Sequence, residues 1–272
     1  MKDFIAEKNG KLSKLALMQI TDLSFSALMS ALKKKDVKIN GKRTDKDINL
    51  NVGDKVEIYY KPTEKQSFSV VFFDTNILVV NKYRGVSSEF IYEKVLKDFG
   101  EAYFIHRLDT NTAGLMIFAL NSIAEKELLG GFKSHSFYKA YHARVKGVPK
   151  KQKEILTAYL FKNETSSVVT ITDKKVKGSV LIKTGYKIIK KGEDFSDLLV
   201  TLFTGKTHQI RAHLAHIGHP VLGDGKYGDF AFNSKMKVKR QMLTATNLTL
   251  YFEENSPLYY LNGKSFTVSS GF

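Results

Sequence analysis

The chain has 272 residues, of which 43% are hydrophobic and 26% charged, a balance typical of a folded globular protein and not of a disordered or fibrous one. Its 43 Lys and Arg residues against 27 Asp and Glu give a formal net charge of +16, which favours polyanionic partners and above all nucleic acid. It contains no cysteine, which excludes disulfides, thiolate metal sites and cysteine nucleophiles. No apolar run is long enough to span a membrane and no signal peptide is recognisable, so we expect a cytoplasmic protein without membrane contact.

Residues 11–60 have the pattern of a small unit of two helices followed by strands. The spacing of apolar side chains predicts two helices, one with Leu12, Leu15 and Ala16 and one with Leu28, Ala31 and Leu32. Asp22 or Ser24 could cap the second helix. Alternating apolar residues before Asn40-Gly41 and after Gly53-Asp54 predict short strands. We predict that residues 1–62 form an amino-terminal domain.

A cluster of basic residues closes the second helix and continues into the strands. Its members are Lys33, Lys34, Lys35, Lys38, Lys42 and Arg43. One interpretation is a solvated helix end whose cations meet the helix dipole. The whole unit, however, resembles the small RNA-binding module named after the fourth protein of the small ribosomal subunit, with its V-x-I-N-G turn at residues 37–41 and its G-D-x-V strand at residues 53–56. The resemblance implies that these cations bind RNA.

The rest of the chain has the pattern of a sheet-rich domain. Residues 61–67 are polar, contain a proline and are the best candidate for a linker. Beyond them, apolar runs at 77–80, 115–118 and 198–200 alternate with a few helical segments. We therefore predict an α+β fold, with a mixed, mainly antiparallel sheet in a catalytic domain at residues 68–272 and a small helix-helix-strand domain before it.

Three side chains of this second domain are candidates for chemistry. Asp109 lies in a predicted loop directly before a buried strand, a place from which a side chain can reach a substrate, although an isolated Asp here would most simply pair with Arg107 or backbone amides. Tyr141 points inward on a predicted strand at 138–146, where a core role is equally open. Arg211 lies near the start of a helix predicted from about 207 to 217, where a carboxylate partner would offset the positive end of the helix dipole.

Three segments in order, HRLDTNTAGL at 106–115, KAYHARVKG at 139–147 and TGKTHQIR at 204–211, together with GHPVLGD at 218–224, resemble the RluA-type pseudouridine synthase family. The resemblance implies an isomerase that converts uridine to pseudouridine in RNA without cofactor, metal or nucleotide. It implies that Asp109 is the essential carboxylate and that Arg211 is its ion-pair partner, with Lys206 as the alternative cation. Tyr141 would stack on the flipped uracil, with proton transfer as a second role.

The same resemblance bears on the substrate. Arg107 would fill the gap left by the flipped base, and His106 and Lys206 would also contact RNA. The added amino-terminal module favours ribosomal RNA, most simply that of the large subunit, over transfer RNA, and we expect a monomer.

Two other functions remain open from the residues. A non-catalytic RNA-binding or ribosome-assembly factor would keep the charge but would not require Asp109, Tyr141 and Arg211 together. A metal-dependent nuclease would use a group of histidines, namely His208, His213, His216 and His219, for which separate structural hydrogen bonds are the simpler expectation. The Gly205-Lys206-Thr207 sequence lacks the earlier glycine of a phosphate-binding loop, because residue 200 is Val, so no ATP site is expected.

Overall fold

The computed structural model describes residues 1–20, 23, 25–60, 67–162 and 168–272. They form two compact units, one of Met1–His106 with Met116–Lys126 and one of Arg107–Leu115 with Glu127–Phe272. The cap candidates Asp22 and Ser24, and the linker predicted at 61–67 except for Ser67, lie outside the described residues. The division into domains at 1–62 and 68–272 therefore stays a prediction.

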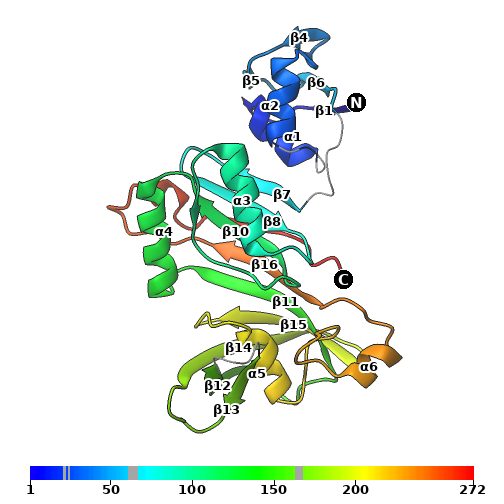
Figure 1. The fold of residues 1–272 in the computed structure, drawn as a ribbon, viewed down its shortest axis with the longest axis vertical. Helices are drawn as coiled ribbons and strands as arrows, with labels where there is room; N and C mark the ends of the chain where they lie inside the picture. Colours follow the sequence, from blue (N-terminus) through cyan, green and yellow to red (C-terminus); the bar gives the residue numbers. More distant parts are fainter. Residues whose placement is uncertain (21–22, 24, 61–66, 163–167) are drawn as a thin grey trace. The chain divides into compact units, whose positions relative to one another are not determined.

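The amino-terminal part of the first unit consists of two helices and a small sheet (Figure 1). Helix α1 covers Leu12–Gln19 and helix α2 covers Phe25–Lys33. The strands β1 (Lys2–Ile5), β6 (Lys55–Ile58), β3 (Val37–Ile39) and β4 (Lys42–Thr44) form an antiparallel sheet in that order, and β2 (Gly10–Lys11) pairs with β5 (Asn49–Leu50). From α1 onward the predicted order of two helices followed by strands is confirmed, but β1 and β2 precede the helices.

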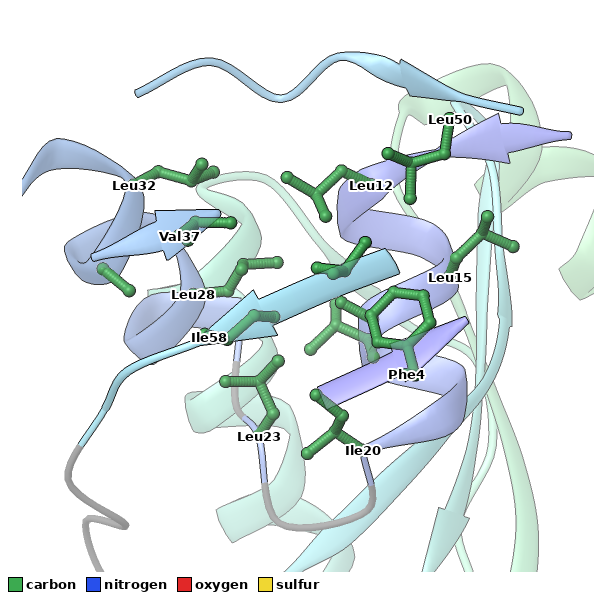
Figure 2. Close-up of a cluster of buried hydrophobic side chains, with 14 of the residues drawn as sticks. Phe4, Leu12, Leu15, Ile20, Leu23, Leu28, Leu32, Val37, Leu50 and Ile58 are labelled. Atoms are coloured by element: carbon green, nitrogen blue, oxygen red, sulfur yellow. The ribbon is translucent and has the colours of Figure 1, made fainter. Parts of the chain in front are cut away.

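The core of this part is a single apolar cluster between the helices and the sheet (Figure 2). The predicted inner residues of both helices are all buried: Leu12, Leu15, Ala16, Leu28, Ala31 and Leu32. Two details differ from the prediction. Helix α2 ends at Lys33, because Lys35 adopts a left-handed conformation with φ of 57°, so Lys34 and Lys35 lie in the following turn. Strand β1 was not predicted, because only one of its four residues, Phe4, is buried and no alternation is visible.

The turn between β3 and β4 explains the Asn-Gly sequence. Asn40 and Gly41 both have positive φ, 49° and 80°, which is the backbone of a tight hairpin turn that these two residue types favour. The Asn40 side chain donates to Asp54 at 2.8 Å and accepts from the Lys55 amide at 2.9 Å. Asp54 also accepts from the Asn51 amide, and these bonds lower its pKa, that from Asn51 most. The two turns of the module are thus tied together.

The first unit continues with the hairpin of β7 (Phe68–Phe73) and β8 (Ile77–Lys82) and with helix α3 (Ser88–Phe99). The Ser87 hydroxyl caps α3 by accepting from the Phe90 amide at 3.1 Å. Strand β9 (Tyr103–Phe104) pairs with the second half of β10 (Ala113–Ala119). Helix α4 covers Ser122–Ser134. The apolar runs predicted at 77–80 and 115–118 therefore lie in β8 and β10.

The second unit is built on a mainly antiparallel sheet. Its strands follow the order β13 (Val169–Thr172), β12 (Lys153–Lys162), β14 (Val180–Lys191), β15 (Phe195–Leu202), β11 (Tyr138–Lys146) and β16 (Leu243–Thr249). The beginning of β10 pairs with β16 in parallel orientation. Strand β17 (Ser265–Thr267) pairs with the end of β16 in antiparallel orientation. The predicted fold class, α+β with a mixed and mainly antiparallel sheet, is confirmed. No helix among the described residues is long and apolar enough to cross a membrane.

Helix α5 (Gln209–His216) packs on one face of this sheet, where Ala212 joins the apolar cluster of Ala158, Leu160 and Ile182 (Figure 1). It begins two residues later than predicted, because His208 has a left-handed backbone with φ of 55° and ends the preceding turn. The short helix α6 covers Phe230–Lys235 and a 3₁₀ turn covers Tyr259–Leu261. The predicted strand at 138–146 coincides with β11, in which Tyr141, Ala143 and Val145 are buried as expected.

Candidate functional site

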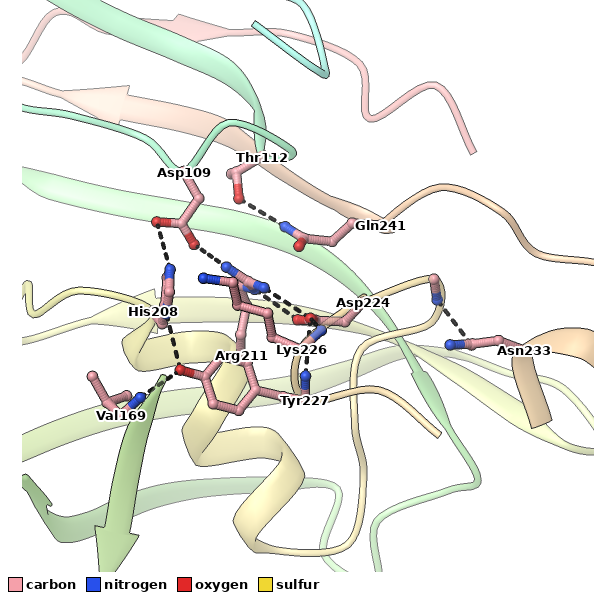
Figure 3. A network of polar contacts seen from close by, with 11 residues as sticks. Asp109, Thr112, Val169, His208, Arg211, Asp224, Lys226, Tyr227, Asn233 and Gln241 are labelled. Carbon is pink, nitrogen blue, oxygen red and sulfur yellow. Dashed lines mark hydrogen bonds and ion pairs between the residues drawn. The ribbon is translucent and has the colours of Figure 1, made fainter. Parts of the chain in front are cut away.

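Asp109 lies in the loop that leads into β10, and the loop is held by buried polar contacts (Figure 3). The Asp109 carbonyl accepts from the Thr112 amide at 2.9 Å. The Thr112 hydroxyl in turn accepts from the Gln241 side chain at 2.9 Å, with both residues buried. A buried hydrogen bond of this kind is costly to break. The carboxylate is therefore presented from a fixed loop at the beginning of a strand.

Arg211, on the first turn of α5, connects two carboxylates (Figure 3). Its Nη1 donates to Asp109 Oδ2 at 2.7 Å, while Nε and Nη2 donate to the two oxygens of Asp224 at 2.6 and 2.8 Å. Burial disfavours the charged guanidinium, but the two carboxylates outweigh it and raise the pKa of Arg211. The predicted ion pair between Asp109 and Arg211 is present, and the side chain of Lys206, the alternative cation, is exposed in the turn before α5.

Asp224 is the residue that fixes Arg211. Its side chain is fully buried, with 0% exposure, and it also accepts from the backbone amides of Lys226 and Tyr227 at 2.8 and 3.1 Å. Burial raises the pKa of a carboxyl group, but the bonds from Arg211 and the two amides prevail, so the pKa of Asp224 is lowered. The same carboxylate therefore holds the arginine and the turn that carries Tyr227.

A second chain of contacts reaches Asp109 from the other side. The Tyr227 hydroxyl lies 2.9 Å from His208 Nδ1 and accepts from the Val169 amide at 2.7 Å. The other ring nitrogen of His208, Nε2, lies 3.9 Å from Asp109 Oδ1 (Figure 3). Each oxygen of the Asp109 carboxylate thus faces a different nitrogen, one from Arg211 and one from His208.

Tyr141 is buried in the middle of β11, on the sheet face that it shares with Val200 of β15. Burial, and in second place the negative charge of Asp109, raises the pKa of its phenol. The Tyr141 phenol is therefore neutral near neutral pH, and its ring lies close enough to Asp109 to be influenced by that charge.

The other predicted RNA contacts lie in different places. Arg107 is exposed, and His106 Nε2 accepts from the Ile117 amide at 3.1 Å. The basic cluster of the amino-terminal part is exposed at Lys33, Lys34, Lys35 and Arg43. Arg43 is 3.6 Å from Asp36 and Lys35 is 3.7 Å from Asp45. Exposed ion pairs of this kind contribute only about 0–1 kcal/mol to stability.

The four histidines proposed for a metal site each have a separate partner. His208 bonds to Tyr227, His213 to Thr184 at 3.0 Å, His216 to Asp173 at 2.8 Å and His219 to the Lys146 carbonyl at 2.9 Å. Burial, the largest cause, lowers the pKa of His213 to about 4, so this side chain is neutral near pH 7. The expected structural hydrogen bonds are therefore confirmed.

Sequence reasoning missed Asp224, Tyr227 and the bond between Thr112 and Gln241. One signal was available for Asp224, because a buried arginine has more donors than a single carboxylate can satisfy. No comparable signal pointed to Gln241, which lies far along the chain from Thr112.

The mixed sheet carries a buried arginine between two carboxylates, and comparison with known sequences shows the class of the protein. A family model described as RNA pseudouridylate synthase matches residues 76–216. The chain belongs to this family, whose members are isomerases. The chain is an RNA pseudouridine synthase of the RluA type.

The relatives share about a quarter of their residues with this chain. A protein of Vibrio parahaemolyticus named ribosomal large subunit pseudouridine synthase C is 27% identical over 90% of this chain and 85% of its own length. The dual-specificity RNA pseudouridine synthase RluA of Salmonella typhi is 28% identical over 69% of this chain and 91% of its own. The solved structure of human RNA pseudouridylate synthase domain containing 1 is 28% identical, with a TM-score of 0.60 over 69% of this chain and 80% of that one.

Proposed function

We propose that Asp109 is the catalytic carboxylate that isomerises uridine in structured RNA. The observation that supports it most is the bond from Arg211, which fixes Oδ2 at 2.7 Å, while His208 Nε2 faces Oδ1 at 3.9 Å. The side chain is nevertheless 22% exposed, so a substrate can reach it. A carboxylate that is oriented by its neighbours and still accessible suits covalent or proton-transfer chemistry.

The reaction needs one carboxylate and no reagent. The glycosidic bond from N1 of uracil breaks, the base turns, and C5 bonds to the ribose carbon while the proton of C5 is lost and N1 gains one. The carboxylate could attack the sugar, attack the base, or remove a proton from the sugar to give a glycal-like intermediate. Since atoms and electrons balance within the substrate, we propose turnover without cofactor, nucleotide or metal.

Tyr141 and Arg211 have supporting roles in this proposal. Tyr141 offers a neutral ring on which a flipped uracil can stack. Arg211 holds the Asp109 side chain in one rotamer through the bond from Nη1 to Oδ2. Arg107, exposed two residues before Asp109, would enter the gap that the uracil leaves.

We propose ribosomal RNA of the large subunit as the substrate. The support is the name of the Vibrio relative, which aligns over most of both chains, and the basic amino-terminal module. Lys33, Lys34, Lys35, Lys38 and Arg43 would hold phosphates there, while the second unit carries the chemistry.

The experiment is to map pseudouridines in total RNA from cells with and without this protein. We expect one or a few sites in large-subunit ribosomal RNA to depend on it. Purified protein should restore them in a buffer with EDTA and without nucleotide. The mapping identifies the target RNA. If the dependent sites were found only in transfer RNA, the assignment to ribosomal RNA would be wrong, although the isomerase activity would stand.

The catalytic assignment is tested with Asp109→Asn, which keeps size but removes the carboxylate. We expect restoration of pseudouridine to fall below detection, with thermal unfolding and RNA affinity close to those of the wild type. Asp173→Asn is a matched control, because Asp173 is exposed and pairs with His216 at the far end of α5. Near-normal turnover by Asp109→Asn would remove Asp109 from the mechanism.

A further inference from the structure

The hydroxyl of Tyr227 has a defined direction of hydrogen bonding. The backbone amide of Val169 can only donate, and its nitrogen lies 2.7 Å from the phenolic oxygen. The second group that this oxygen contacts among the described residues is His208 Nδ1, at 2.9 Å. If Nδ1 also donated, the phenolic hydrogen would lack an acceptor among these groups, which is costly for a partly buried hydroxyl. The phenol therefore donates to Nδ1.

This direction fixes the protonation of His208. An imidazole whose Nδ1 accepts a hydrogen bond is neutral and has its single hydrogen on Nε2. Nε2 is the nitrogen that faces Asp109 Oδ1, at 3.9 Å (Figure 3). That distance is longer than a hydrogen bond, but catalytic contacts are often long in the absence of substrate and shorten in the complex.

The charges around His208 agree with a neutral ring. Burial, the largest cause, lowers the pKa of His208, and the cations Arg211 and Lys226 lower it further, while Asp109 and Asp224 act against them. These groups come from the loop before β10, from α5 and from the turn at 224–227. A second cation beside Asp109 would weaken the carboxylate as a base or nucleophile. A neutral N–H donor orients the carboxylate without that penalty.

The backbone at His208 is itself unusual. His208 has φ of 55°, a left-handed conformation that costs energy for a residue other than glycine and that is concentrated at functional sites. It directs the imidazole between Tyr227 and Asp109 directly before α5 begins. The geometry is thus held by the turn as well as by the side-chain contacts.

We propose that His208 is a positioning residue for Asp109, held by Val169 and Tyr227 as a neutral donor whose Nε2 hydrogen orients Oδ1 while Arg211 orients Oδ2. This inference rests on the proposed function of Asp109. The hydrogen bonds from the Val169 amide to the Tyr227 phenol and from the phenol to His208 Nδ1 do not depend on the proposed function.

The tautomer is tested directly by nitrogen-15 NMR of the histidine rings in the full-length protein. His208→Gln identifies the signals of His208 by their loss, and His216→Gln, at the exposed end of α5, controls for changes elsewhere. We expect an unprotonated Nδ1 and a protonated Nε2 at neutral pH. A ring protonated on Nδ1, whether neutral or cationic, would overturn the proposal.

The positioning role is tested with Tyr227→Phe in single turnover on bound RNA. Loss of the hydroxyl frees Nδ1, so we expect the His208 titration midpoint to rise and the bound-state rate to fall about tenfold, the value of roughly one hydrogen bond. RNA affinity should stay within about twofold. Tyr186→Phe is the matched control, because its hydroxyl bonds Glu154 at 3.2 Å, outside the contacts of Asp109.

His208→Gln and His208→Ala separate positioning from packing. The glutamine amide can still donate toward Asp109, so it should retain more of the bound-state rate than alanine does. Equal rates in these two variants, or an unchanged rate and titration midpoint in Tyr227→Phe, would leave His208 a structural residue. If Asp109→Asn remained active while the NMR result stood, the proposed function would fail and the tautomer would not. If Asp109→Asn were inactive and the tautomer wrong, only this inference would fail.

Discussion

Arg211 is buried, with 5% of its surface exposed, and all three of its side-chain nitrogens donate hydrogen bonds to carboxylate oxygens. A buried cation is tolerated only when its partners are close and fixed. Asp224, which is fully buried, meets that condition with a bidentate bond, while Asp109 binds through one oxygen and stays reachable. Asp224 therefore holds the arginine, and Asp109 is the carboxylate that remains accessible.

The pKa of Asp224 gives a prediction of stability against pH. Its folded-state pKa lies below the ordinary value, so its stabilising effect is fully present above the ordinary Asp pKa and is lost as pH falls through the folded-state value. Asp224→Asn leaves Arg211 with one carboxylate, and we expect it to cost about 3 kcal/mol at pH 7. The difference in the free energy of unfolding between wild type and Asp224→Asn, measured in urea, should become smaller as the pH falls below the ordinary Asp pKa. A gap independent of pH would contradict this account.

Tyr141 gives a second prediction at the scale of single residues. Tyr141→Phe keeps the ring and should retain binding of the flipped base, whereas Tyr141→Ala loses ring and hydroxyl and leaves a cavity in β11. We expect the alanine variant to be at least about tenfold slower than phenylalanine in single turnover with bound RNA. Equal rates for wild type and Tyr141→Ala, in a protein that remains folded, would make Tyr141 a core residue only.

Some positions in the site were predictable from the sequence and others were not. The inward direction of Tyr141 followed from period-two alternation, and the need of Arg211 for a carboxylate partner followed from its place at a helix start. That Asp109 is this partner came from the family resemblance. Asp224 did not follow, because its bond to Arg211 depends on a turn between α5 and α6 that local patterns do not define. His208 was considered as a metal ligand, whereas its contacts with Tyr227 and Asp109 depend on a left-handed backbone that no sequence pattern indicated.

At the scale of elements, Gly114 allows β10 to begin beside β16. It has φ of 112°, and a Cβ there would lie 2.2 Å from the Ala245 carbonyl oxygen. No side chain fits this approach, which explains a glycine five residues after Asp109. The apolar pattern predicted the strand but not the parallel pairing, because pairing partners are distant in sequence.

Gly114→Ala should therefore destabilise the protein by about 2 kcal/mol or more and should reduce turnover by moving the Asp109 loop. Gly130→Ala is the contrasting control, since Gly130 lies within α4 with open space around its Cβ position. That change should stabilise by about 0.5–1 kcal/mol. Thermal and urea unfolding measure both, and equal stability of Gly114→Ala and wild type would contradict the close approach.

In the molecule as a whole, the proposed catalytic site and the proposed phosphate-binding cluster lie in different parts of the chain. The contacts around Asp109 all belong to the second unit, and the proposed phosphate-binding cluster belongs to the first. The net charge of +16 indicated a polyanionic partner, but it could not show which cations meet phosphate, because exposed lysines occur throughout the sequence.

Charge changes at matched sites distinguish those cations. Changing Lys33, Lys34 and Lys35 together to Gln should weaken RNA binding and flatten the slope of log affinity against log salt by up to about 2–3, because each lost phosphate contact contributes roughly 0.7–0.9. The bound-state rate at saturating RNA should change far less than the affinity, since none of the three contacts Asp109. The control changes Lys174, Lys175 and Lys177, which are equally exposed, and removes the same charge from the second unit. If both triple variants flatten the slope equally, binding reflects net charge alone, and the amino-terminal module has no special part in holding RNA.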